Sequence, residues 1–270
     1  TLQGRSHRFK SCSNHKSVKK LLIVTLIKIL FTITTLYKSI YYYVKMNEDL
    51  DIAALESLTF AKNYNSHILK LLLSSLDRKD NILDFGAGYG LFTEKLKKKG
   101  YKISALEKNE KAIEKLKEKN LINYKTIDQI KEKIDCVISL NVLEHIENDQ
   151  EIVKDIYNLL KKDGKLLLYV PSSNLVWSNL DVLVNHVRRY DKKGLKNLLS
   201  RAGFEVEQIY YVDFIGWSVL LFSKLIRMEL EFDKRKIKFY DQYIFIIFKF
   251  FDKLFKNIIG KNLFVVAKKL

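Results

Sequence analysis

Three glycines at alternate positions, Gly86, Gly88 and Gly90, follow a short apolar run in which Asp84 is the one charged residue. Glycine permits a sharp turn and allows a ligand to lie close to the main chain. The helix predicted to follow would present free N–H groups and the positive end of its dipole. Because ligands of open α/β sheets bind where strands end, the pattern predicts a small-molecule site at this turn.

The spacing of these glycines distinguishes between ligands. A dinucleotide-binding loop has the form G-x-G-x-x-G, which would place a glycine where this chain has Leu91. Glu107 ends the next predicted strand, where a carboxylate can accept hydrogen bonds from both hydroxyls of a ribose. The alternative is a plain strand–helix turn with an incidental surface glutamate.

The form D-x-G-x-G-x-G, from Asp84 to Gly90, resembles motif I of class I S-adenosylmethionine (SAM)-dependent methyltransferases. With the later segments, the resemblance covers about residues 50–269. Over this range the chain is similar to bacterial methyltransferases of types 11, 12 and 23, which often occur beside or fused to glycosyltransferases. It implies SAM as the cofactor and a small-molecule, sugar- or lipid-linked methyl acceptor. The supporting segments are 61–65 (AKNYN), 143–146 (LEHI), 169–171 (YVP), 186–190 (HVRRY), 202–204 (AGF) and 260–267 (GKNLFVVA).

The resemblance assigns the cofactor-binding residues one by one. Gly86, Gly88 and Gly90 form the turn around the amino-acid part of SAM. Asp84 occupies the position of the acid that reaches the SAM amino group, directly or through water. Glu107 matches the acid that binds the ribose.

Two further cofactor positions match the family less closely. The family usually has an aspartate just after the third strand, but Thr126 stands there, so Asp128 is the candidate for the adenine side. Asn141 begins the loop after the fourth strand, at the methyl-transfer end of the sheet. It could contact SAM or the substrate, or it could cap a helix.

His186 and His145 are the candidate catalytic residues, because a neutral imidazole can take a proton from a hydroxyl. A structural role is the alternative for His145, since many methyltransferases work mainly by aligning the reacting atoms. No metal ligand is assigned.

Arg188, Arg189 and Tyr190 accompany His186 and are the candidate substrate-binding residues. Two arginines can bind a carboxylate or phosphate in bidentate fashion. The alternative is that the arginines brace the sheet edge and that Tyr190 packs in the core.

Strands and helices alternate along the chain from residue 48. This alternation predicts an α/β domain with a Rossmann-like, doubly wound, mostly parallel seven-stranded sheet and helices on both faces. The predicted helices are 53–76, 91–99, 110–119, 150–162 (stopped by Gly164) and 192–201, with Asp191 as an N-cap. The predicted strands are 81–85, 101–106, 122–126, 134–140, 165–170, 204–212 and 263–267.

Residues 214–259 form an unusually apolar and aromatic segment before the last strand. We expect a helical insertion that either caps the active site as a lid or faces a membrane, with residues 240–259 as an amphipathic helix.

The chain has 48 Lys and Arg against 31 Asp and Glu, a formal net charge of +17. Lysine is abundant together with Ile, Asn, Tyr and Phe, which all have A/T-rich codons, so the excess of lysine can reflect the base composition of the genome. The charge is therefore not taken as a sign of nucleic-acid binding, and no nucleic-acid partner is expected. Cys12 and Cys136 cannot form a disulfide framework, which fits a reduced, cytoplasmic setting. Peripheral contact with the inner face of the membrane stays an alternative. The oligomeric state is left open.

Residues 1–45 carry basic residues and no acid, and they lack helix–strand alternation. The stretch 7–12 (HRFKSC) can be encoded by a nucleotide sequence that forms a complementary stem around a typical tRNA T-loop. We therefore expect 1–45 to be translated from upstream sequence, with Met46 as the start of the methyltransferase domain 46–270. A membrane anchor at 21–44 is the alternative.

Three function classes are compatible with these observations. A SAM-dependent methyltransferase explains most of them. An inactive protein with the same fold that binds at the membrane is the alternative, and a nucleotide-dependent oxidoreductase is disfavoured by Leu91.

Overall fold

A computed structural model describes residues 56, 59–231, 233–246 and 250–270. Within these residues, seven strands form one sheet in the order β3-β2-β1-β4-β5-β7-β6. Neighbouring strands are parallel except β7, which is antiparallel to both β5 and β6. The predicted mostly parallel sheet is therefore confirmed. The strands are β1 Asn81–Phe85, β2 Lys102–Leu106, β3 Asn123–Tyr124, β4 Ile134–Leu140, β5 Leu160–Pro171, β6 Phe204–Val212 and β7 Asn262–Lys269.

Helices cover both faces of the sheet, as the doubly wound fold requires. Helices α5 and α7 pack on one face, and α2 and α3 pack on the other. The helices are α2 Lys62–Leu73, α3 Leu91–Lys98, α4 Glu110–Glu118, α5 Asp149–Leu159, α6 Asn179–Leu183, α7 Lys192–Ala202, α8 Phe214–Leu225, α9 Lys234–Phe239 and α11 Phe251–Phe255, with the π-helix η4 Tyr240–Phe245 and 3₁₀ turns η1 Ile127–Gln129, η2 Leu143–His145 and η3 Asn174–Val176.

The core consists of two hydrophobic layers, one on each face of the sheet. Along β5, Leu166 and Leu168 belong to the layer under α5 and α7, whereas Leu167 and Tyr169 belong to the layer under α2. Successive side chains of a strand point to opposite faces, so a central strand must be apolar at every position. This requirement explains the uninterrupted apolar run in β5.

The end of α5 differs from the sequence prediction. The helix ends at Leu159 rather than near residue 162, and Asp163, not Gly164, adopts the left-handed conformation (φ +63°). A Cβ on Gly164 would lie 2.9 Å from the carbonyl oxygen of Lys161. The glycine is therefore needed for close backbone approach within β5, and the strand begins earlier than its apolar run suggested.

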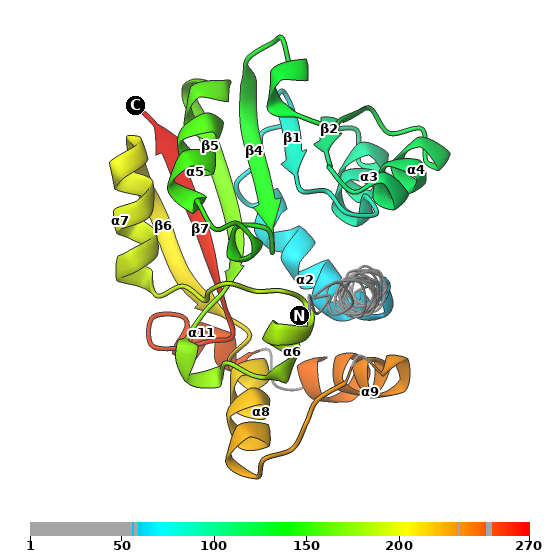
Figure 1. Ribbon diagram of the computed structural model, residues 1–270, viewed down its shortest axis with the longest axis vertical. Coiled ribbons are helices and arrows are strands. Elements are labelled where there is room, and N and C mark those ends of the chain that lie inside the picture. Colours follow the sequence, from blue (N-terminus) through cyan, green and yellow to red (C-terminus); the bar gives the residue numbers. More distant parts are fainter. Residues whose placement is uncertain (1–55, 57–58, 232, 247–249) are drawn as a thin grey trace, which may run out of the picture. The chain divides into compact units, whose positions relative to one another are not determined.

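The insertion lies at the end of the sheet where the parallel strands terminate, the end opposite to the C-terminus (Figure 1). Its described elements are α8, α9, η4 and α11. Helical structure begins at Lys234, before the predicted start at residue 240, and residues 247–249 of the predicted helix lie outside the described residues. Across the part of the chain that the structure describes, no helix is long and apolar enough to span a bilayer. The expectations for residues 1–45 and Met46 lie outside the described residues.

Asp241 joins the insertion to the start of α2. Its buried carboxylate accepts hydrogen bonds from the backbone N–H groups of Asn63 (2.9 Å) and Tyr64 (2.8 Å). The first N–H groups of a helix have no partner within the helix, and a carboxylate there also interacts favourably with the helix dipole. An N-cap supplied from 177 residues away therefore holds the insertion against the sheet.

Replacing Asp241 with alanine is expected to lower the free energy of unfolding by about 1–2 kcal/mol, because the N-terminus of α2 loses its cap. Urea unfolding measures the change. Glu114, an exposed acid within α4, provides the control, and Glu114→Ala should change stability by less than about 0.5 kcal/mol. Equal effects of the two substitutions would contradict the capping role.

Candidate active site

The three glycines form a tight loop between β1 and α3. Gly86, Gly88 and Gly90 all have positive φ angles, of +76°, +52° and +70°. A Cβ on Gly86 would lie 2.5 Å from the side chain of Val142, and one on Gly90 would lie 2.6 Å from that of Leu116. The loop is therefore packed against the segment after β4 on one side and against α4 on the other, which fixes its position at the carboxyl edge of the sheet.

Asp84 lies beneath this loop with its side chain buried. Its carboxylate accepts a hydrogen bond from the hydroxyl of Thr93 (2.6 Å) at the start of α3. Burial raises the pKa of Asp84 to about 7, and the nearby charge of Glu107 also raises it, whereas the bond from Thr93 lowers it. A cationic amino group at this place would favour the charged carboxylate, as the family resemblance implies.

Glu107 stands at the end of β2 and holds the glycine loop from the other side. One carboxylate oxygen accepts a hydrogen bond from the N–H of Gly88 (2.7 Å), and the other accepts from the N–H groups of Lys108 (2.8 Å) and Asn109 (2.9 Å). The sequence-predicted ribose acid and the sequence-predicted glycine loop are therefore brought into direct contact.

Replacing Glu107 with alanine is expected to weaken SAM binding about tenfold or more. The variant would lose ribose contacts that contribute roughly 1.5–3 kcal/mol, as well as the bond that fixes Gly88. Calorimetric titration with SAM measures the effect. Glu110, an exposed acid at the start of α4, provides the control, and Glu110→Ala should leave the affinity unchanged. A change below twofold in Glu107→Ala would remove this residue from the cofactor site.

Asp128 and Asn141 occupy different environments. Asp128 is exposed on η1, and its backbone carbonyl accepts a hydrogen bond from Lys131. Asn141 follows β4 in the left-handed conformation (φ +55°), and its side-chain oxygen accepts a bond from Asn262 (3.4 Å). Because this side chain bonds to β7 rather than to a helix N-terminus, the helix-cap alternative for Asn141 is wrong. A non-glycine residue held at positive φ is a feature of functional loops.

His145 and His186 come together although they are 41 residues apart. Their rings lie 4.7 Å apart, edge to face, where the loop after β4 meets the loop after β5. The Nδ1 atom of His186 lies 2.8 Å from the carboxylate of Asp181. Partial burial of the ring and the neighbouring His186 lower the pKa of His145 to about 4. His145 is therefore a neutral imidazole at physiological pH.

Arg188 and Arg189 are held by the protein itself. Arg189 binds both oxygens of the buried Asp181 carboxylate (2.8 and 3.0 Å) and donates to the carbonyl of Ser172 (3.0 Å). Arg188 pairs with Asp149 and donates to the carbonyl of Glu147 (2.6 Å). These contacts support the bracing alternative over the substrate-binding one.

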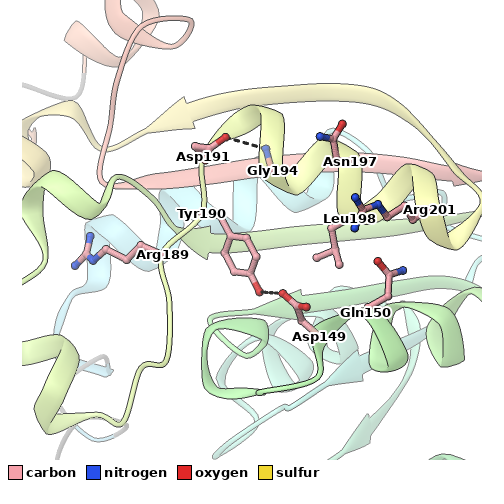
Figure 2. A pocket seen from close by; sticks show the side chains of 9 residues that line it. All are labelled: Asp149, Gln150, Arg189, Tyr190, Asp191, Gly194, Asn197, Leu198 and Arg201. Carbon is pink, nitrogen blue, oxygen red and sulfur yellow. Dashed lines mark hydrogen bonds between the residues drawn. The ribbon is translucent and has the colours of Figure 1, made fainter.

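Tyr190 is buried and donates a hydrogen bond to Asp149 (2.8 Å). It lines a pocket of about 440 Å³ between α5 and α7. Figure 2 shows the ring of Tyr190 pointing to Asp149, whereas Arg189 points away from the other lining side chains. The lining includes Arg189 and Tyr190 of the predicted substrate-binding residues, but neither histidine and no residue of the glycine loop.

Sequence reasoning missed a polar cluster between β7 and the insertion. Lys261 pairs with the buried Asp213 (3.0 Å), which also accepts a hydrogen bond from Tyr240 (2.9 Å). The paired Asp213 raises the pKa of Lys261 against the opposing effect of burial. Nearby, the hydroxyls of Tyr64 and Tyr169 lie 2.8 Å apart. The sequence indicated only two members of this cluster, because Tyr64 and Lys261 lie in segments that resemble the family. No local spacing links them to Asp213 or Tyr240, which are far away in the sequence.

Two acids beside the histidines were also missed. Glu144 is fully buried, and burial raises the pKa of its carboxyl to about 8. Asp181 is buried as well, but His186 and Arg189 hold the pKa of its carboxyl well below the usual value against the effect of burial. Glu144 stood in the quoted LEHI segment, but its neighbour His145 drew the functional assignment.

The chain was compared with known families and proteins. Residues 58–209 match the methyltransferase-domain family of type 23. A ubiquinone biosynthesis O-methyltransferase of Rickettsia akari is 31% identical over 115 residues, which are 39% of this chain and 42% of that protein. The corresponding protein of Rickettsia canadensis is 35% identical over 95 residues, 32% of this chain and 40% of that protein. The aligned regions thus span about two fifths of these relatives' length.

Solved structures agree on the fold. A SAM-dependent methyltransferase of Thermotoga maritima, described as a possible histamine N-methyltransferase, superposes with a TM-score of 0.53 at 16% identity and covers 78% of this chain and 92% of that one. The magnesium protoporphyrin IX methyltransferase of Synechocystis with bound SAH gives a TM-score of 0.51 at 14% identity over 82% and 86% of the two chains.

The family match covers more than half of the 270 residues, and the sheet order and glycine loop agree with it. These findings favour a methyltransferase over the oxidoreductase alternative. The chain belongs to the methyltransferase-domain family of type 23 and has the fold of class I SAM-dependent methyltransferases.

Proposed function

We propose that this enzyme transfers the methyl group of SAM to an oxygen atom of a lipid- or sugar-linked acceptor held at a membrane surface. The observation that carries the proposal is the surface of the insertion. This insertion lies at the edge of the sheet where the parallel strands terminate, the edge at which the glycine loop and the two histidines also lie (Figure 1).

The insertion exposes many large apolar side chains, which we call the insertion surface. Among them, Leu225 is 73% exposed and Leu254 is 67% exposed. Exposed lysines and arginines of the same segment flank them, from Lys224 to Lys256. Apolar side chains with a basic border fit a bilayer that contains anionic lipids. The surface comprises Phe222, Leu225, Ile226, Met228, Phe239, Tyr243, Ile246, Phe250, Leu254 and Ile258.

The insertion also fits the role of a lid. The indole N–H of Trp217 in α8 donates to the hydroxyl of Ser173 (3.3 Å), which follows β5. The carboxylate of Asp252, just inside α11, accepts a bond from the N–H of Phe214 (2.8 Å) at the start of α8. These contacts support a cover over the acceptor end that excludes water and orients the acceptor.

Oxygen as the acceptor atom has two supports. The aligned Rickettsia proteins are O-methyltransferases by name. In this chain, Val142 packs against the glycine loop, His145 follows it by three residues, and the ring of His186 lies against that of His145. A neutral imidazole there can take the proton of an acceptor hydroxyl. Asp181 would orient His186 for that role.

At the cofactor end, we assign the amino-acid part of SAM to Asp84 and the glycine loop, and the ribose to Glu107. Asp128 remains the candidate for the adenine side. Asn141 would face the methyl group, because it follows β4 beside the glycine loop.

Incubation of the full chain with methyl-labelled SAM and total membrane lipids tests the proposal. We expect label in the organic extract, in a form from which hot hydriodic acid releases labelled methyl iodide, as it does from oxygen-linked methyl groups. Label confined to the aqueous phase, with water-soluble acceptors supplied in parallel, would overturn the membrane-held acceptor.

The membrane contact gives a separate prediction. Replacing both Phe222 and Leu225 with serine is expected to weaken binding to anionic vesicles about 30-fold or more, since each buried apolar side chain contributes roughly 1 kcal/mol or more. Vesicle co-sedimentation at low and high salt measures binding. Ile122, which is 63% exposed beside β3, provides the control, and Ile122→Ser should bind as the parent does. Equal binding by all three proteins would contradict the assignment.

A further inference from the structure

Glu144, His145 and His186 form a compact group of possible metal ligands. Their ligand atoms all lie within 4.8 Å of one another, and the Nε2 atom of His186 lies 3.7 Å from a carboxylate oxygen of Glu144. Four ligands around a zinc ion, each about 2.0–2.2 Å from it, lie about 3.3–3.5 Å apart. Small side-chain movements would therefore close this group around an ion. We propose that it binds one divalent transition-metal cation of the zinc class.

The burial of Glu144 is an independent observation in favour of a ligand. Its side chain is fully buried, and neither carboxylate oxygen has a hydrogen-bond partner among residues 59–231, 233–246 and 250–270. A buried carboxylate without partners is strongly unfavourable, and such groups in native proteins usually bind a proton, an ion or water. The oxygen that lies 3.7 Å from His186 faces the second ligand of the group.

The chemistry of the three ligands selects the kind of cation. Two imidazoles and one carboxylate form the set that holds zinc in several hydrolytic enzymes and Fe(II) in others, with open positions left for water or substrate. Magnesium and calcium prefer oxygen ligands, so two histidines disfavour them. The site therefore fits zinc, cobalt, manganese or ferrous iron better than the alkaline-earth ions.

Asp181 and Arg189 act as the outer support of this group. The Nδ1 atom of His186 lies 2.8 Å from Asp181, so a proton on Nδ1 leaves a lone pair on Nε2, the atom that faces Glu144. Metal-binding histidines commonly make such a bond to a carboxylate. Arg189 neutralises Asp181 through a bidentate pair. A dication would balance the charge of the Glu144 carboxylate in this buried position, since metal ligands bind in their deprotonated form.

The backbone fixes the two loops relative to each other before any ion binds. The N–H of Val187 donates to the carbonyl of Glu144 (2.8 Å), and the N–H of His186 donates to the carbonyl of Asp181 (2.9 Å). His145 is the most exposed residue of the three, so the ion would be open to solvent on its side. The open positions could bind the acceptor hydroxyl and favour the loss of its proton, so that in the metal-bound form the ion would take the place of the imidazole base; this last step rests on the proposed function.

The experiment measures metal binding by the full chain after treatment with EDTA. Titration with Zn²⁺ against a chromophoric chelator is expected to show one tight site per chain. Co²⁺ should give the visible absorption bands of a four- or five-coordinate nitrogen and oxygen site. Glu144→Gln and His186→Ala should each weaken Zn²⁺ binding at least tenfold and remove the cobalt bands. Asp181→Asn should weaken Zn²⁺ binding by about 10–100-fold.

His67 provides the matched control, because it also lies near a carboxylate, that of Asp252 (3.8 Å), on another part of the fold. His67→Ala should bind Zn²⁺ as the parent does, and SAM binding reports whether each variant is folded. Absence of a stoichiometric site in the parent, or equal affinity in folded Glu144→Gln, overturns the metal site. Zinc binding without methyl transfer to lipids would instead refute only the proposed function.

Discussion

Replacing Gly88 with valine is expected to weaken SAM binding by about 100-fold or more while leaving the protein folded. Gly88 has a φ of +52°, and its N–H donates to Glu107. A β-branched residue is strongly disfavoured at positive φ, so the free variant relieves strain by moving the loop out of its turn. SAM binding would then have to restore the strained loop and would meet a larger side chain. A loss of about 2.7 kcal/mol corresponds to the expected change.

A control for backbone strain is available in the same domain. Gly100 also has a positive φ, of +84°, but it is exposed and its nearest neighbour for a Cβ is the tip of Arg78 at 3.5 Å. Gly100→Val should therefore lower stability by a similar amount without changing SAM affinity. Calorimetric titration with SAM and urea unfolding of both variants measure the two effects. Unchanged SAM affinity in Gly88→Val would remove the glycine loop from the cofactor site.

Local sequence pattern predicted the parts of the fold that depend on local physics. The bounds of β1, β4 and β6 agree with the predicted strands, because β1 and β4 are short, mostly apolar runs and β6 mixes apolar with polar residues between clear turn signals. The glycine loop was identified because three positive φ angles are needed within five residues, and glycine satisfies that need most readily. Glu107 followed from its place at the end of β2.

Tertiary contacts explain what local pattern could not predict. Asp241 caps α2 from 177 residues away, so neither segment alone shows the bond. The apolar insertion has no single periodicity, because its helices turn their faces to α2, to β6 and to the exterior in succession. Within the candidate site, the order HVRRY suggested two free arginines next to a histidine. The partner that removes this freedom is Asp181 in the short helix α6, which the sequence analysis did not predict.

Replacing Arg189 with alanine is expected to lower the free energy of unfolding by about 3–5 kcal/mol, because it leaves the buried Asp181 carboxylate without its main counter-charge. The Arg189 side chain is 6% exposed and that of Asp181 is 1% exposed, so water cannot compensate fully. Arg189→Lys keeps the charge but loses the bidentate geometry, and an intermediate loss is expected. Urea unfolding measures both.

Arg188 is the natural comparison for this test. Its pair with Asp149 is more accessible, with the arginine 30% exposed, so Arg188→Ala should cost only about 1 kcal/mol. If Arg189 instead bound an anionic acceptor, Arg189→Ala would keep its stability and SAM affinity and lose turnover alone. The bracing role predicts the opposite order: stability falls first, and the loops that carry His186 and Glu144 loosen with it. The same variant should therefore also weaken Zn²⁺ binding, whereas Arg188→Ala should not.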